Sequence, residues 1–444
     1  MLGLILKRSA LLMTGTVGSA VLSFAQSIFL TRALTPDLVG VWAIGGSVAM
    51  VVFGLLGFRS IDAVNRSLAL LPEGCRDLRG AVITSALAAE FAAASVCLAL
   101  LLAGSSWLMP HLSSSADAVA ITLLQAVSIF FLWMDRPFQA LCRTTGSYRR
   151  ITQIALMSGT VKLLATMGLF ALGELTLMRF GYLQVAISAL TFMAHGASMN
   201  QFMARNLSIG FSDLSIATAW RHRRNLNCFW NLMIASFWSS CCSSVFKQID
   251  VILLGAWRGD ADAGLYRVAK SLATLAQTVG STLAFSIFTE FNDLLSRRAY
   301  DELRHEIGRT VRLLLPMAVV LNLGGIALHW LIPFIYGPQY AGSASLLQMQ
   351  LLGVTFGLVL FWGFPLLVAL GGEWTYLTMM IAGIIIQFSL SYLLLPRGEG
   401  AMPMAIIYSI CWGGLHTALA VVSMRLLRRR RRAHARSQVD TLQA

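Results

Sequence analysis

Four ionisable side chains lie inside two apolar runs that one short turn joins, in residues 247–270, which read KQIDVILLGAWRGDADAGLYRVAK. Lys247 and Asp250 are three residues apart near the end of one apolar run, and Arg267 and Lys270 are three residues apart near the start of the next. A three-residue step keeps each pair on one face of a helix. Lysine attracts an anion as a point charge, and arginine can hold a phosphate through two parallel hydrogen bonds. These residue types can therefore bind an anionic group.

Two more ionisable residues fall deep inside apolar runs. Lys162 is flanked by Ser158, Thr160 and Thr166, far from either end of its run, and Glu90 is similarly deep in an earlier run. Two interpretations stay open, because charges in such positions either pair with one another or face a polar cavity. Under the first, Glu90 pairs with Lys162.

The charges at 247–270 have the same two interpretations. Lys247 can simply pair with Asp250, while Arg267 and Lys270 extend their apolar stems toward an aqueous surface. Glu90 and Asp250 are also candidates for coupling to protons or sodium ions, and the sequence does not separate these uses.

The composition places these charges in a membrane protein. The chain has 444 residues, of which 57% are hydrophobic and 12% charged, and its mean hydropathy is +0.71. A helix that crosses a hydrocarbon core needs roughly 20 mostly apolar residues. Windows of this kind follow one another almost without interruption, so the sequence predicts a polytopic, all-α membrane protein.

The apolar runs, turn residues and charges divide the chain into about twelve predicted transmembrane helices. Their predicted bounds are 9–30, 39–58, 80–103, 116–135, 150–172, 178–201, 228–254, 262–289, 311–335, 343–370, 375–395 and 403–425.

Arginine and lysine predict the orientation of these helices. Most of the 34 basic residues fall before the first helix, in alternate connections between helices, or after the last one. Because basic residues are retained on the cytoplasmic side of a membrane, both termini are predicted to be cytoplasmic. The net charge of +14 is then an orientation signal, and we predict no nucleic-acid partner.

Five charged residues are predicted to lie at the cytoplasmic ends of the second and fourth helices. They are Arg59, Asp62, Arg66, Asp135 and Arg136. In this position they can receive a headgroup from the inner leaflet. The more common role of such residues is to fix the ends and the orientation of helices.

Two connections are longer than a tight turn. Residues 205–227 carry the basic run RHRR, which is typical of a cytoplasmic linker. Residues 290–312 alternate leucines with charged residues, a pattern that predicts an amphipathic helix on the inner membrane surface. The basic tail after residue 427 is expected to contact anionic lipid.

An internal repeat is visible at an offset of 224 positions, where residues 30–43, LTRALTPDLVGVWA, align with residues 254–267, LGAWRGDADAGLYR. Gly40 aligns with Gly264, and Trp42 aligns with Tyr266. A second similarity, at an offset of 228, aligns Pro137 with Pro365. Both offsets are close to half the chain length.

The repeat predicts two parallel six-helix bundles around a central cavity. The predicted domains are an N-terminal bundle of residues 1–204, a basic cytoplasmic linker of residues 205–227, a C-terminal bundle of residues 228–427 and a basic cytoplasmic tail of residues 428–444. Rocking two such bundles exposes the cavity to each side in turn, so transport is the predicted function.

Several of these segments resemble a known family. FLTRALTPDLVGVWAIGGSV near the N-terminus is similar to the opening of polysaccharide transporters in the multidrug/oligosaccharidyl-lipid/polysaccharide (MOP) flippase superfamily. QIDVILLGAWRGDADAGLYRVAKSL, LIPFIYGPQYAGSASLLQM and LLPRGEGAMPMAI extend the resemblance over nearly the whole chain. Together they resemble the O-antigen and exopolysaccharide flippase branch.

The resemblance implies a bacterial inner-membrane flippase that moves undecaprenyl-diphosphate-linked oligosaccharides to the outer leaflet by alternating access. It implies lipid-linked oligosaccharide and membrane lipids as partners, with the polysaccharide polymerase and export machinery as further candidates. Such a substrate needs cations for its phosphates. Lys247, Arg267, Lys270 and Lys162 are the candidates for that role.

Two alternatives remain beside the flippase. A multidrug exporter of the same superfamily would favour an acidic cavity, whereas the charges inside the predicted helices lean positive. A membrane glycosyltransferase or polymer ligase would need a substantial outer loop, and none is long enough to be convincing. No phosphate-cradling glycine-rich loop, HExxH helix or paired histidines at metal spacing occurs, so we predict no enzyme, cofactor or metal site.

Overall fold

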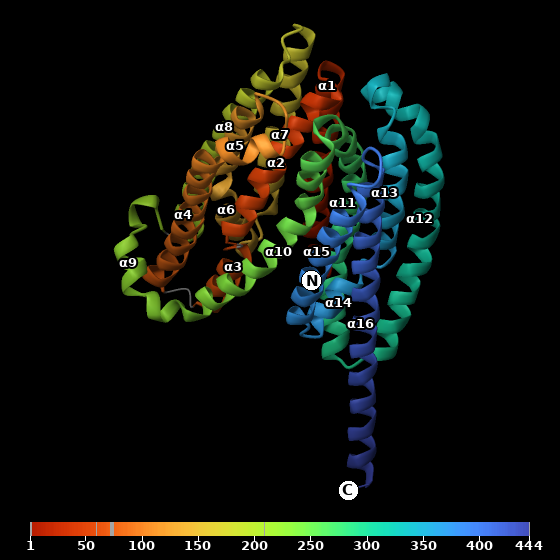
Figure 1. The fold of residues 1–444 in the computed structure, drawn as a ribbon. Coiled ribbons are helices and arrows are strands. Elements are labelled where there is room, and N and C mark those ends of the chain that lie inside the picture. The colour runs from red at the N-terminus through yellow and green to blue at the C-terminus, as the bar shows by residue number, and fades with distance from the viewer. Residues whose placement is uncertain (1, 59, 72–74, 208, 444) are drawn as a thin grey trace. The chain divides into compact units, whose positions relative to one another are not determined.

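The computed structural model describes all residues except 1, 59, 72–74, 208 and 444, and among these described residues regular structure is entirely helical (Figure 1). The α-helices are α1 (Leu2–Ala33), α2 (Pro36–Leu56), α3 (Ser60–Leu70), α4 (Arg76–Leu108), α5 (Ala118–Phe130), α6 (Asp135–Thr144), α7 (Tyr148–Ala171), α8 (Leu177–Asn206), α9 (Ile216–Arg221), α10 (Asn227–Arg258), α11 (Asp260–Ser296), α12 (Tyr300–Tyr336), α13 (Ser343–Val359), α14 (Gly363–Ala369), α15 (Glu373–Leu394) and α16 (Met402–Gln443).

Each predicted transmembrane helix coincides with one helix or with one helix interrupted by a break. Within the described part of the chain, nine helical segments are long and apolar enough to cross a membrane. They match the second to sixth and the ninth to twelfth predicted spans. The first, seventh and eighth predicted spans fall on α1, α10 and α11. The prediction of an all-α polytopic membrane protein is confirmed.

The chain divides into two compact units, Met1–Gly264 and Leu265–Ala444. This division differs from the predicted one, because the repeat predicted a boundary in the linker at residues 205–227. The difference comes from packing: α10 lies along α2 and α3, so it belongs to the first unit although it begins the second repeat. The division into two six-helix domains stays a prediction.

The predicted linker is folded as part of the first unit. Arg76 at the start of α4 forms an ion pair with Asp213, with Nη2 and Oδ2 2.7 Å apart. A hydrogen bond from the backbone amide of Gly210, together with the one from Arg76, holds the pKa of Asp213 below its usual range. Farther along, Ala219 and Leu226 are buried in the core that α3, α4, α6 and α8 form.

Small residues let α2 and α10 approach closely. A Cβ atom added to Gly54 would lie 2.2 Å from the Ser244 side chain, and one added to Gly255 would lie 2.4 Å from the Ile44 side chain. Small residues of this kind are how membrane helices bring their backbones together. The hydroxyl of Ser47 also donates to Gln248 Oε1 over 3.2 Å.

The two glycines that mark the repeat contact one another's helix. A Cβ atom on Gly40 would lie 1.8 Å from the backbone oxygen of Asp260, and one on Gly264 would lie 1.9 Å from that of Pro36. Asp260 is the repeat equivalent of Pro36, so the contact is reciprocal, as in a twofold interface. We call these four residues the glycine joint; they begin α2 and α11.

The weaker repeat similarity also has a structural counterpart. The helix pair α5 and α6 is interrupted by a 3₁₀ turn, η2 (Phe131–Met134), and α13 and α14 are interrupted by a turn at residues 360–362. At an offset of 228 these breaks coincide. Pro137 and Pro365 each occupy the third position of the helix that follows.

In the second unit, residues 290–312 do not form the separate surface helix that their pattern predicted. Residues 290–296 end α11, and residues 300–312 begin α12. Phe291, Leu294, Leu303 and Ile307 are buried in one core with residues of α14 and α16. The apolar face that the pattern indicated is present, but it packs against α14 and α16.

The predicted orientation can be measured with reporters fused to truncated chains. A reporter placed after Arg258 should be active in the periplasm, and one placed after Arg223 should be active in the cytoplasm, because basic residues are retained inside. Paired alkaline phosphatase and green fluorescent protein fusions provide the measurement. The opposite pattern would overturn the topology.

Candidate functional site: a charge pair at a broken helix

The second membrane-spanning helix is broken near its end. α2 ends at Leu56 and α3 begins at Ser60, and the backbone amide of Gly57 makes the last helical bond, to Phe53 O. A break of this kind leaves carbonyl groups of the first helix and amide groups of the second without helical partners. Inside a membrane such groups must find partners in neighbouring helices.

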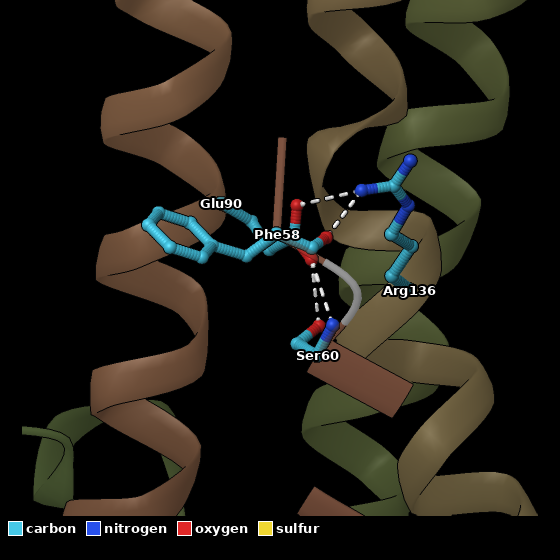
Figure 2. A network of polar contacts seen from close by, with 4 residues as sticks. All are labelled: Phe58, Ser60, Glu90 and Arg136. Carbon is cyan, nitrogen blue, oxygen red and sulfur yellow. Dashed lines mark hydrogen bonds and ion pairs between the residues drawn. The ribbon is translucent and has the colours of Figure 1, made fainter. Parts of the chain in front are cut away.

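Glu90, on α4, supplies the partner for the start of α3. Its Oε1 accepts hydrogen bonds from the Ser60 backbone amide at 3.3 Å and from the Ser60 hydroxyl at 2.8 Å (Figure 2). The Glu90 side chain is completely buried. Its carboxylate therefore caps the N-terminus of α3, although Glu90 belongs to a different helix.

Arg136, on α6, supplies the partner for the end of α2. It donates a hydrogen bond to the backbone oxygen of Phe58, and the same nitrogen lies 3.4 Å from Glu90 Oε2. Figure 2 shows the guanidinium reaching both oxygens. Its Cζ also lies 5.0 Å from the centre of the Phe53 ring, which is a cation-π distance.

The signs of the two charges fit the two helix ends. An anion is favoured at a helix N-terminus and a cation near a C-terminus, because backbone dipoles leave partial charges there. Glu90 meets the N-terminus of α3, and Arg136 meets the carbonyl that follows α2. We call Phe58, Ser60, Glu90 and Arg136 the helix-break clamp. It neutralises a buried acid while it holds the break in place.

A second polar pair adjoins the clamp. Asp135 precedes Arg136 in the chain, and its Oδ1 lies 3.6 Å from Nε2 of His195, on α8. Gln139 donates to the other carboxylate oxygen over 2.9 Å. The buried His195 ring stacks on Phe138 with centroids 4.8 Å apart. Adjacent charges at the start of α6 thus join it to α4 in one direction and to α8 in the other.

Lys162 belongs to a polar stripe on α7. Ser158, one turn before it, hydrogen-bonds to Thr191 of α8 over 2.9 Å, and Thr166, one turn after it, accepts from Gln26 of α1 over 2.9 Å. Lys162 itself is half-buried between these contacts. Among the described residues its ammonium group has no ion-pair partner, since Glu90 is bound to Arg136.

The four charges inside the apolar runs of residues 247–270 lie in different units, two in each. In the first unit Lys247 is exposed, while Asp250 is completely buried and accepts a hydrogen bond from the Val251 amide at 2.8 Å. In the second unit Arg267 is half-buried and Lys270 is buried. The Lys270 ammonium lies 5.8 Å from the centre of the Tyr408 ring, on α16. Their common phosphate-binding role stays a prediction.

The five residues predicted at the cytoplasmic mouth have different environments. Arg59 lies outside the described residues. Asp62 and Arg66 are exposed on α3, one turn apart. Asp135 and Arg136 are each engaged in the pairs described above. For these two, the interpretation that they fix helix ends agrees with their contacts.

Ser60 and His195 are functional candidates that the sequence did not reveal. Ser60 lies between two charged residues, Arg59 and Asp62, that are the more obvious candidates in this segment. The available signal was Gly57, because a glycine at the end of an apolar run, with polar residues at 59 and 60 soon after it, favours a helix break. His195 lies singly in an apolar helix and had no comparable signal.

No family model and no curated protein sequence matches this chain, but solved structures match it over nearly its whole length. A multidrug resistance MATE family transporter of the MOP superfamily, in an inward-facing conformation, has a TM-score of 0.69 at 14% identity, covering 93% of this chain and 96% of its own. The lipid II flippase MurJ, in an inward closed conformation, has a TM-score of 0.70 at 14% identity, covering 94% and 87%.

A further match is a MATE protein in complex with MaL6, with a TM-score of 0.66 at 13% identity over 96% of this chain and 97% of its own. At these identities the similarity establishes the architecture. The chain is a multi-pass membrane protein with the two-bundle fold shared by MATE transporters and the lipid II flippase MurJ.

Proposed function

We propose that this protein is a flippase that moves lipid-linked oligosaccharide units, carried on undecaprenyl diphosphate, across a bacterial inner membrane by alternating access. Both termini would be cytoplasmic, and a polysaccharide polymerase would use the product outside. One observation carries the choice of an anionic substrate. Of the two charges that the sequence places deepest in the first six predicted spans, the acid Glu90 is neutralised by Arg136, whereas the cation Lys162 has no acidic partner among the described residues.

The argument rests on what an unpaired charge in a membrane favours. A half-buried ammonium without a carboxylate attracts an anion, and a phosphate on a lipid is an anion that enters from the bilayer. A cationic drug would require the reverse, an accessible carboxylate. In the clamp the carboxylate of Glu90 is completely buried and already accepts three hydrogen bonds.

The fold alone leaves both substrate classes open, because the matching structures include multidrug transporters as well as a lipid II flippase. The multidrug alternative therefore differs from our proposal in the charge of the substrate, while the fold is the same. It predicts that removing Glu90 or Asp250 abolishes activity. Our proposal predicts that removing Lys162 does so.

Replacing Lys162 with methionine should reduce outward movement of a lipid-linked saccharide by about tenfold or more, since a lost charge-assisted bond corresponds to roughly that factor. Lys162→Arg should retain most of the activity, because it keeps the charge. Thr160→Ala is the matched control on the exposed face of the same helix. The measurement is the rate at which a labelled lipid-linked saccharide reaches the outer leaflet of proteoliposomes. Equal rates for Lys162→Met and the wild type would exclude the proposal.

The three cations predicted within residues 247–270 provide an independent test in cells. Neutralising Lys247, Arg267 and Lys270 together should block surface-polysaccharide output and cause lipid-linked intermediates to accumulate on the inner side. Immunoblotting of membranes controls for insertion. Unchanged polysaccharide output in the triple variant would show that these three cations do not serve the substrate.

A further inference from the structure

The first turns of α12 border a shallow, open hollow of about 340 Å³ in the second unit. It is lined by Asp301, Arg304, His305, Gly308 and Arg312. These positions follow one another at steps of one, three or four residues, so they form a single stripe along the helix. A Cβ atom on Gly308 would have nothing within 4 Å, which leaves the backbone bare at the middle of the stripe.

The balance of charge in the hollow is positive. Its one acidic residue, Asp301, is paired with Arg431 of α16, with Nη2 and Oδ1 2.9 Å apart. Arg304 and His305 are exposed and have no ion-pair partner among the described residues. Arg312 donates from Nε to the backbone oxygen of Gly308 at 3.3 Å, so its terminal nitrogens extend beyond that bond. The hollow therefore favours an anion.

The same stripe becomes apolar immediately after Arg312. Continuing at helical spacing, it runs through Leu315, Val319, Leu323, Ile326 and Trp330, which are between 50% and 86% exposed. The opposite face of α12 carries the buried residues and packs against α13. In a membrane protein a continuous exposed apolar stripe faces acyl chains.

We propose that this stripe is a binding site for an anionic glycerophospholipid of the cytoplasmic leaflet. The headgroup phosphate lies over Gly308 between Arg304 and Arg312, with His305 as a further donor, and the acyl chains follow the apolar residues. The order of a basic hollow followed by about four turns of apolar surface matches a phosphate attached to long chains. Because this surface is open along its length, it suits a resident lipid better than a substrate that must be enclosed during transport.

The test uses the full-length protein, delipidated in detergent, with phosphatidylglycerol and phosphatidylcholine as probes. Native mass spectrometry should show tighter binding of phosphatidylglycerol, and the variant Arg304→Gln/Arg312→Gln should weaken it by about tenfold or more. The matched control is Arg309→Gln, an exposed arginine near Glu306 that does not line the hollow. Its affinity should remain within about twofold of the wild type.

Gly308→Leu fills the hollow while it keeps every charge, so it tests the site when the double variant folds poorly. It should also weaken phosphatidylglycerol binding, and circular dichroism verifies folding. Equal affinity for the two lipids, or equal losses in Arg309→Gln and the double variant, would overturn the proposal. Displacement of phosphatidylglycerol by equimolar undecaprenyl phosphate would assign the hollow to the transported lipid instead. Lys162→Met should bind phosphatidylglycerol normally, so this result is independent of the transport assay.

Discussion

Replacing Arg136 with methionine should lower the free energy of unfolding by about 3–5 kcal/mol, the loss expected when one partner of a buried ion pair is removed. Glu90 is completely buried, and its carboxyl group would be left with only the Ser60 bonds. The Phe58 carbonyl would lose its donor as well. Denaturant titration of the purified protein in detergent measures the effect.

The double variant Glu90→Gln/Arg136→Met separates charge from packing. Without the carboxylate no buried charge is left unbalanced, so the double variant should be more stable than the sum of the single losses, by a coupling of about 1–3 kcal/mol. Arg149→Met is the matched control, because Arg149 is exposed on α7. If the free energies of the two single variants simply add up to that of the double variant, Glu90 and Arg136 do not stabilise one another and the clamp is refuted.

Adding one methyl group at the glycine joint should have an effect of similar size. In Gly40→Ala or Gly264→Ala the new carbon would fall within 2 Å of a backbone oxygen, and a backbone cannot move aside as a side chain can. We expect each variant to lose about 3 kcal/mol or more. The starts of α2 and α11 should also exchange amide hydrogens faster in both variants.

Two other glycines provide the control for this prediction. Gly104 in α4 and Gly168 in α7 have nothing within 4 Å of an added Cβ atom, and alanine favours a helix over glycine by about 0.5–1 kcal/mol. Gly104→Ala and Gly168→Ala should therefore be neutral or slightly stabilising. If all four variants behaved alike, the close approach of α2 and α11 would be refuted.

The membrane helices were predictable because each is a long apolar run bounded by charges or turn residues. The prediction for α15, residues 375–395, differs from the observed bounds Glu373–Leu394 by two residues at most. The repeat was predictable for a similar reason. Its markers are backbone features, a glycine and a proline at fixed positions after a break, which the sequence records directly.

The partners of the charges were not predictable from the sequence. Glu90 was expected to pair with Lys162, if it paired at all, because both lie deep in their helices. The structure pairs it with Arg136, which was placed at the membrane surface. The pairing with Lys162 was one of two open interpretations, and it treated the second span as one straight helix. Once α2 breaks at Gly57, the unpaired backbone groups at residues 58 and 60 need a cation and an anion from other helices.

The glycine joint also restricts which residues the two repeats can have at equivalent positions. Each glycine is fixed by a backbone oxygen of the other repeat, at Asp260 and Pro36, so neither half can gain a side chain there independently. The residues that supply only those oxygens are free to differ, and they do, as proline and aspartate. A side chain at either glycine would meet one of those oxygens, which accounts for the glycine shared by the two repeats at an offset of 224.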